Sequence, residues 1–160
     1  MSVEEKMFLH ILSNTLKDFE KELADINNLV KDNAITVYNN IDLEYKRVQP
    51  LLKTMIKTID ALKNHLFIID NPFKKDKDEI LDLEENLLSI RERVNSSIRT
   101  ISEIFFLVDE NVDAQPFNDT LVKFDNYLNV SMVLQEIVEE LINLQARQRN
   151  LHNYNQDTTS

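Results

Sequence analysis

The sequence predicts an all-α protein that folds as an antiparallel up-down four-helix bundle. Apolar residues recur at alternating three- and four-residue steps through four long segments, as they do along one face of a helix. The 160 residues include no glycine, on which tight hairpin turns and phosphate-binding loops depend. The expected helices cover about residues 2–31, 35–69, 77–108 and 117–151, within a single domain of residues 1–151. A long helical rod or coiled-coil hairpin is the alternative fold.

The first helix is expected to begin at Ser2, because Ser2 and Glu5 have the spacing of a capping box. Its apolar seam is Leu9, Leu12, Leu16, Phe19, Leu23, Ile26 and Val30. The pattern breaks at residues 31–33, where Asn33 can turn the chain. If the helix continued instead, the first two helices would form one rod of roughly 100 Å.

The second helix contains a proline, Pro50, which removes one backbone donor and costs ~3 kcal/mol in a straight helix. Its seam is Val48, Leu52, Met55, Ile59, Leu62, Leu66 and Ile69. Because the seam keeps its phase across Pro50, a kink is expected rather than a break. The kink is either a static bend or a functional hinge.

Asp76 has the position of a cap for the third helix. The third seam is Ile80, Leu83, Leu87, Ile90, Val94, Ile98, Ile101, Phe105 and Val108. The fourth seam is Phe124, Tyr127, Val130, Leu134, Ile137, Leu141, Leu144 and Leu151. Residues 152–160 are polar and have no seam, so we expect a disordered tail.

Charge is distributed unevenly along a chain whose net charge is −10. Residues 46–77 carry eight basic and three acidic side chains, whereas residues 1–45 carry four and nine and residues 78–117 three and ten. We therefore expect the basic second helix to pack between the acidic first and third helices. The net charge argues against binding to nucleic acid. No membrane span or signal peptide is evident, which suggests a cytoplasmic location and leaves the nucleus open.

The sequence contains few of the residue groups on which enzymes depend. It has no cysteine, and none of its three histidines completes the Glu-x-x-His spacing of di-metal bundles. No glutamate is expected on the inward seams, and a phosphate-binding loop would require glycine. We predict no catalytic residue, no metal site and no cofactor, and hence no enzyme.

Candidate partner-binding residues occur where the apolar pattern is wider than one seam. Phe67 ends the second helix and Phe105 and Phe106 lie in the third, so a partner or second copy is expected to cover them. Between these helices, Asn71-Pro72-Phe73 resembles the short ligand motif that endocytic EH domains bind. Asn and Pro are also ordinary turn formers, which gives the motif a purely structural interpretation.

A basic patch is the second candidate surface. Its residues are Lys46, Arg47, Lys53, Lys57, Lys63, Lys74, Lys75 and Lys77. They would face either an acidic helix of the same chain, or an anionic membrane surface or acidic partner.

Together these features favour a non-enzymatic interaction or scaffold module that is a subunit of a larger assembly and is able to self-associate. The alternatives are a membrane-surface helical dimer that uses residues 46–77, and a small-molecule sensor bundle. If Phe106 belongs to the core, we expect the partner surface on the acidic face of the third helix, around Asp82, Glu85 and Glu92.

Overall fold

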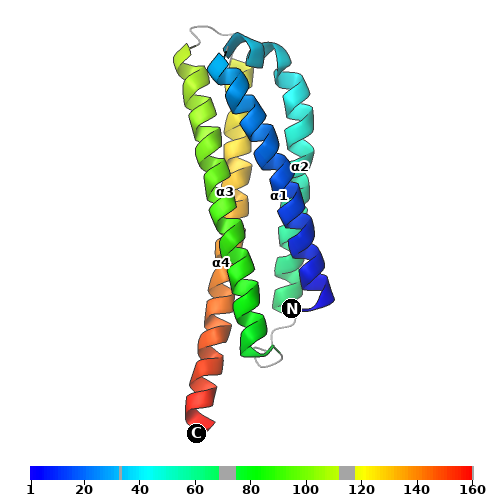
Figure 1. The fold of residues 1–160 in the computed structure, drawn as a ribbon, viewed down its shortest axis with the longest axis vertical. Helices are drawn as coiled ribbons and strands as arrows, with labels where there is room; N and C mark the ends of the chain where they lie inside the picture. The colour runs from blue at the N-terminus through cyan, green and yellow to red at the C-terminus, as the bar shows by residue number, and fades with distance from the viewer. Residues whose placement is uncertain (33, 69–74, 112–117, 160) are drawn as a thin grey trace.

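The computed structural model shows four long helices that run alternately up and down (Figure 1). They are α1 (Val3–Asp32), α2 (Ala34–Ile68), α3 (Lys77–Asn111) and α4 (Asn118–Thr159). The structure describes residues 1–32, 34–68, 75–111 and 118–159, and the side chains of most of them. No strand occurs in these ranges, so the predicted all-α four-helix bundle is confirmed. The described helices contain no segment that is long and apolar enough to cross a membrane.

The helices occupy the corners of a square in the order α1, α2, α4, α3. α1 packs against α2 and α3, and α4 packs against α3 and α2, while α2 and α3 lie on a diagonal. The long-rod alternative is therefore wrong, because α1 and α2 run side by side. The predicted packing of the basic second helix against the third is also wrong. Four apolar seams can share one core in either order, and surface ion pairs of ~0–1 kcal/mol are too weak to choose between them.

Side-chain caps begin α1 and α3 as the sequence predicts. The Ser2 N–H donates to Glu5 Oε2 over 2.9 Å, and the Glu5 N–H donates to Ser2 Oγ over 3.1 Å. The Glu79 N–H donates to Asp76 Oδ1 over 2.8 Å. Each cap satisfies backbone donors that a helix start otherwise leaves free, which explains why the two helices begin there.

The seams of α1 and α2 form their half of the core as predicted. Buried are Leu9, Leu12, Leu16, Phe19, Leu23 and Ile26 on α1, and Val48, Leu52, Met55, Ile59, Leu62 and Leu66 on α2. The side chains of Val30 and Ile69 lie outside the described residues. α2 is helical on both sides of Pro50, so the proline does not break it. In Figure 1 the first part of α2 crosses the upper end of the bundle before the helix descends.

The buried stripe of α3 departs from the prediction after Val94. Ser97 and Ile104 are buried, whereas Ile98 and Phe105 are only half-buried. The stripe keeps alternating steps of three and four, as in a coiled coil, and so reaches Ser97 rather than the more apolar Ile98. The Ser97 hydroxyl donates to the Arg93 carbonyl over 3.0 Å, which lets this polar side chain be buried.

Three positions of the predicted fourth seam are wrong, whereas Tyr127, Leu134, Leu141 and Leu144 are buried as predicted. The side chain of Phe124 lies outside the described residues. Val130 and Ile137 are half-buried and Leu151 is exposed, while Ser131, Val138 and Gln145 face the core. The buried stripe is Tyr127, Ser131, Leu134, Val138, Leu141, Gln145 and Gln148, with Ile142 and Leu144 beside it. α4 contacts both α2 and α3. The side of α4 that faces the space between these two helices is therefore the side that is buried, even though another stripe of α4 is more apolar.

The predicted end of the fourth helix is also wrong. α4 continues to Thr159, eight residues beyond the predicted end, and extends past the end of the other helices (Figure 1). This segment contains neither proline nor glycine. Polarity removes the reason for a helix to be buried, but it does not interrupt the backbone hydrogen bonds of a helix that has already formed.

Replacing Gln145 with leucine is expected to raise the free energy of unfolding by about 1–3 kcal/mol. Gln145 is fully buried, and its amide oxygen and nitrogen have no partner among the described residues. Gln135→Leu on the same helix is the matched control, because the Gln135 amide donates to Asn95 on α3 over 2.5 Å. The control should lose stability in urea denaturation, and a loss for Gln145→Leu as well would show that its amide is satisfied.

Candidate functional site

Polar contacts join neighbouring helices around the bundle. Arg93 of α3 donates to Ser13 Oγ over 2.9 Å and to Glu20 Oε1 over 2.5 Å, and both acceptors lie on α1. Lys63 of α2 lies 2.8 Å from the Glu140 carboxylate of α4, whose hydrogen bond and charge raise the Lys63 pKa. These contacts neutralise charge where helices meet and stabilise their pairing.

The pair of α3 and α4 has the most buried of these contacts. Glu84 is buried on α3, and its two oxygens accept from Arg149 Nη1 over 2.7 and 2.6 Å. Arg91 of α3 also lies 3.5 Å from Glu139 of α4. Glu84 contradicts the expectation that no glutamate lies on an inward face, and the charged contact of both its oxygens with one arginine nitrogen explains how it is accommodated.

A second buried glutamate, Glu5, lies where the start of α1, the end of α2 and the segment before α3 meet. Its carboxylate forms an ion pair with Lys75, and His65 Nε2 lies 3.8 Å away. Burial raises the Glu5 pKa, but Lys75, the Ser2 N–H and the charge of His65 lower it more, to below its ordinary value of 4.5. His65 Nδ1 also lies 3.0 Å from Glu4 Oε2.

This cluster is structural in form. The Glu5 oxygens already face the Ser2 N–H and Lys75, so neither is directed at an open site. Sequence reasoning identified Glu5 only as a cap, placed Lys75 in the basic patch without a specific partner, and missed His65. The signal was present, because Glu5 precedes Leu9 by four residues and so continues the buried stripe of α1.

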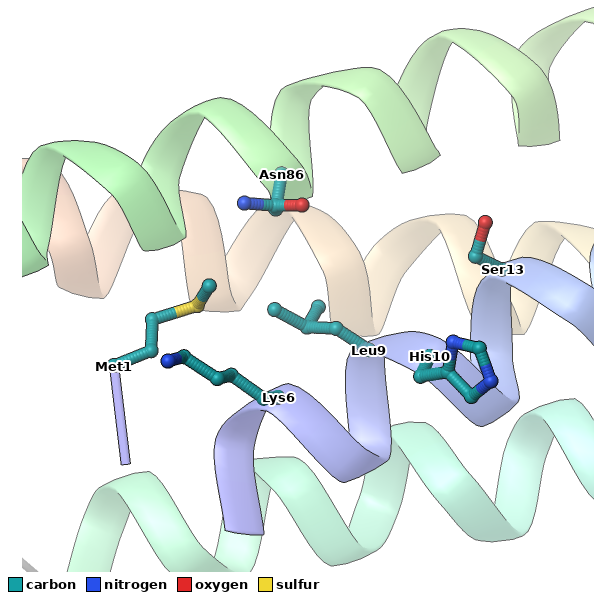
Figure 2. Close-up of a pocket in the computed structure, with 6 residues that line it drawn as sticks. All are labelled: Met1, Lys6, Leu9, His10, Ser13 and Asn86. Atoms are coloured by element: carbon teal, nitrogen blue, oxygen red, sulfur yellow. The ribbon is translucent and has the colours of Figure 1, made fainter. Parts of the chain in front are cut away.

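Two open grooves occur on the described surface. Figure 2 shows the first, about 270 Å³, between α1 and α3; it is lined by Met1, Lys6, Leu9, His10, Ser13 and Asn86. His10 faces Asn14 at 3.0 Å and Ser13 accepts from Arg93, so two of its polar groups are engaged. The second groove, about 420 Å³, is lined by Phe67, Glu140, Asn143 and Arg147. In the first groove the hydrogen bonds of the described residues do not join Ser13 to His10, so these two side chains do not form a nucleophile–base pair in this arrangement.

The aromatic candidates do not form one patch. Phe67 is 45% exposed near the end of α2, and Phe106 is 59% exposed near the end of α3. These helix ends lie at opposite ends of the bundle (Figure 1). Phe105 is half-buried and packs against the core. Asn71-Pro72-Phe73 lies outside the described residues.

The predicted basic patch is divided in the structure. Lys63 pairs with Glu140, Lys75 pairs with Glu5, and Lys77 is half-buried at the start of α3. The exposed members are Arg47, Lys53 and Lys57, all on α2. The side chains of Lys46 and Lys74 lie outside the described residues.

The most regular uncompensated surface is a row along the outward side of α3, which we call the acidic row. Its members follow at steps of four and three, and all are exposed: Asp78, Asp82, Glu85, Ser89, Glu92, Ser96, Arg99, Glu103 and Phe106. None of its five carboxylates forms an ion pair with a described residue of the chain. The row contains the acidic face around Asp82, Glu85 and Glu92 that the sequence offered as the second choice of partner surface.

Comparison of the chain with protein families, curated protein sequences and solved structures finds no match.

Proposed function

We propose that the chain is a non-enzymatic interaction module, a subunit of a protein assembly whose partner docks along the acidic row of α3. One observation carries the proposal. Five exposed carboxylates without an ion partner in the described chain lie in register along one helix, and the row ends at the exposed ring of Phe106. A partner that presents cations and an apolar contact at the same spacing would complement this surface.

The treatment of charge elsewhere in the bundle supports the proposal. Glu5, Glu20 and Glu84, which lie where segments meet, each have a cation of the same chain beside them. The acidic row has only Arg99 within it. Like charges spaced along one helix repel each other, so a basic partner would relieve repulsion that the chain leaves uncompensated.

Phe106 is suited to be the anchor of such a partner. It is 59% exposed, whereas its neighbour Phe105 packs against the core. Exposed aromatic side chains at interfaces often contribute most of the binding energy. The membrane-surface and sensor alternatives have less support, because the basic patch is divided and the two described grooves are open to solvent.

Truncating Phe106 is expected to weaken partner binding at least about tenfold, as for an interface anchor. Its removal should change the free energy of unfolding by no more than about 0.5 kcal/mol. Phe105→Ala is the matched control and should do the reverse, because that ring packs on the core. Affinity capture from native extract with wild-type and variant baits, quantified by mass spectrometry, measures binding, and urea denaturation measures stability.

Two variants test whether the carboxylates of the acidic row contribute to partner binding. Glu85→Lys with Glu92→Lys should abolish capture of the same proteins, whereas Asp18→Lys, an exposed carboxylate on α1, should leave capture unchanged. Equal capture by wild type and by the Glu85→Lys/Glu92→Lys bait would contradict the proposed docking surface.

A further inference from the structure

The outward side of α1 carries a row of opposite charge, which we call the basic row. Its exposed members are Lys6, His10, Asn14, Lys17, Lys21, Ala24, Asn28 and Lys31. It includes four lysines and no carboxylate. The carboxylates of α1 lie on other sides of the helix, as Glu5 and Glu20 show by their contacts with Lys75 and Arg93.

α1 and α3 are neighbours and run in the same direction (Figure 1). Lys6 and His10 of the basic row line the groove between these two helices, and the acidic row is exposed along α3, so we infer that the two rows border one face of the bundle. Arg93 contacts Ser13 and Glu20, whose midpoint lies about 76 positions before it. Asn86 lines the same groove as Leu9 and His10, which gives a similar offset (Figure 2). An α3 residue therefore lies at the same height along the bundle axis as the α1 residue about 76 positions earlier, and we call two such residues level.

At this offset the two rows match member by member. Lys6 lies level with Asp82, His10 with Glu85, and Lys17 with Glu92. Arg99, the one cation of the acidic row, lies level with Ala24, and Glu103 lies level with Asn28. Lys31 lies level with Phe106, over which its cation could stack. At this offset, no two row members that are level carry charges of the same sign.

We propose that two copies of the chain associate side by side through this face, about a two-fold axis parallel to the helices. A rotation of 180° about this axis places the basic row of each copy beside the acidic row of the other copy. The rotation does not shift the copies along the axis, so level residues stay level and the helices of both copies run in the same direction. A two-fold interface must complement itself, and a face bordered by one basic and one acidic row does so. The inference rests on the proposed function, because it names a second copy as the partner of the acidic row.

Charge should govern this association despite the net charge of −10. At about 0.15 M salt the screening length is ~8 Å, so facing side chains act more strongly than the charge of the whole molecule. Individual exposed pairs contribute little, but here they repeat along roughly 38 Å of helix. We therefore expect a weak, salt-sensitive dimer.

Sedimentation velocity of the full chain at roughly 10–200 μM tests the pairing, since weak interfaces dissociate in this range. The wild type should dimerise at about 0.05 M salt and dissociate at about 0.5 M. Lys17→Glu or Glu92→Lys alone should raise the dissociation constant at least about tenfold. The double variant Lys17→Glu/Glu92→Lys should restore it, and Lys53→Glu on α2 should leave it unchanged.

The relative direction of the two copies can be read by cross-linking, because the chain has no cysteine. Asn28→Cys chains mixed with Glu103→Cys chains should form a disulfide, and Asn28→Cys mixed with Glu85→Cys should not. The reverse pattern would overturn the parallel arrangement. A wild type that stays monomeric at low salt would overturn the self-pairing, while capture of another protein that depends on Phe106 would still uphold the proposed function.

Discussion

Leu62→Ala is expected to lower the free energy of unfolding by ~2–5 kcal/mol, because it leaves a cavity in a close-packed core. Leu62 is 0% exposed and belongs to the central apolar cluster. Against a total stability of ~5–15 kcal/mol, this loss is large enough to unfold a marginal bundle. Urea denaturation followed by circular dichroism measures the change.

Ile98→Ala is the control for this prediction. Sequence periodicity treats Leu62 and Ile98 alike, but the structure leaves Ile98 half-buried beside the buried Ser97. The Ile98 variant should lose less than half of what the Leu62 variant loses, because less apolar area is taken out of contact with the core. Equal losses would contradict the buried stripe assigned to α3.

Glu5→Gln is expected to lower stability by about 3 kcal/mol at neutral pH, the lower end of what breaking a buried ion pair costs. The substitution leaves Lys75 mostly buried without its carboxylate and weakens the acceptor for the Ser2 N–H. Glu4→Gln is the control, because the Glu4 carboxylate is exposed and contacts only His65 in this cluster. It should lose much less.

The difference in stability between the wild type and Glu5→Gln is expected to depend on pH, in a direction that follows from the Glu5 pKa. The Glu5 pKa is lower in the folded chain than its ordinary value of 4.5, so the folded state favours the ionised form. Its contribution is therefore complete above about pH 4.5 and is lost as the pH falls through the folded pKa. The stability gap between wild type and Glu5→Gln should shrink as the pH is lowered from about 4.5 through the folded pKa. A gap that is constant over this range would show that the carboxylate does not act through its charge.

The candidate surfaces were predictable only in part. Phe106 and the acidic face of the third helix follow from sequence, because outward residues of a helix recur with a known period. The basic row of α1 was missed, since the nine carboxylates in residues 1–45 conceal it in any sum over the segment. Two of those carboxylates, Glu5 and Glu20, pair with cations that come from distant parts of the chain.

The sequence alone determined the fold class, the helix caps at Ser2 and Asp76, and the buried stripes of α1 and α2. These features depend on local contacts and on apolar residues that repeat every three or four positions, so they can be read without knowing what each helix touches. Only the tertiary structure decided that α2 lies diagonal to α3, that α4 buries Ser131 and Gln145, and that Arg93 of α3 contacts Ser13 and Glu20 of α1. Each of these depends on where two or three helices meet, and the energy differences that select the arrangement are spread over many weak contacts rather than carried by a local pattern.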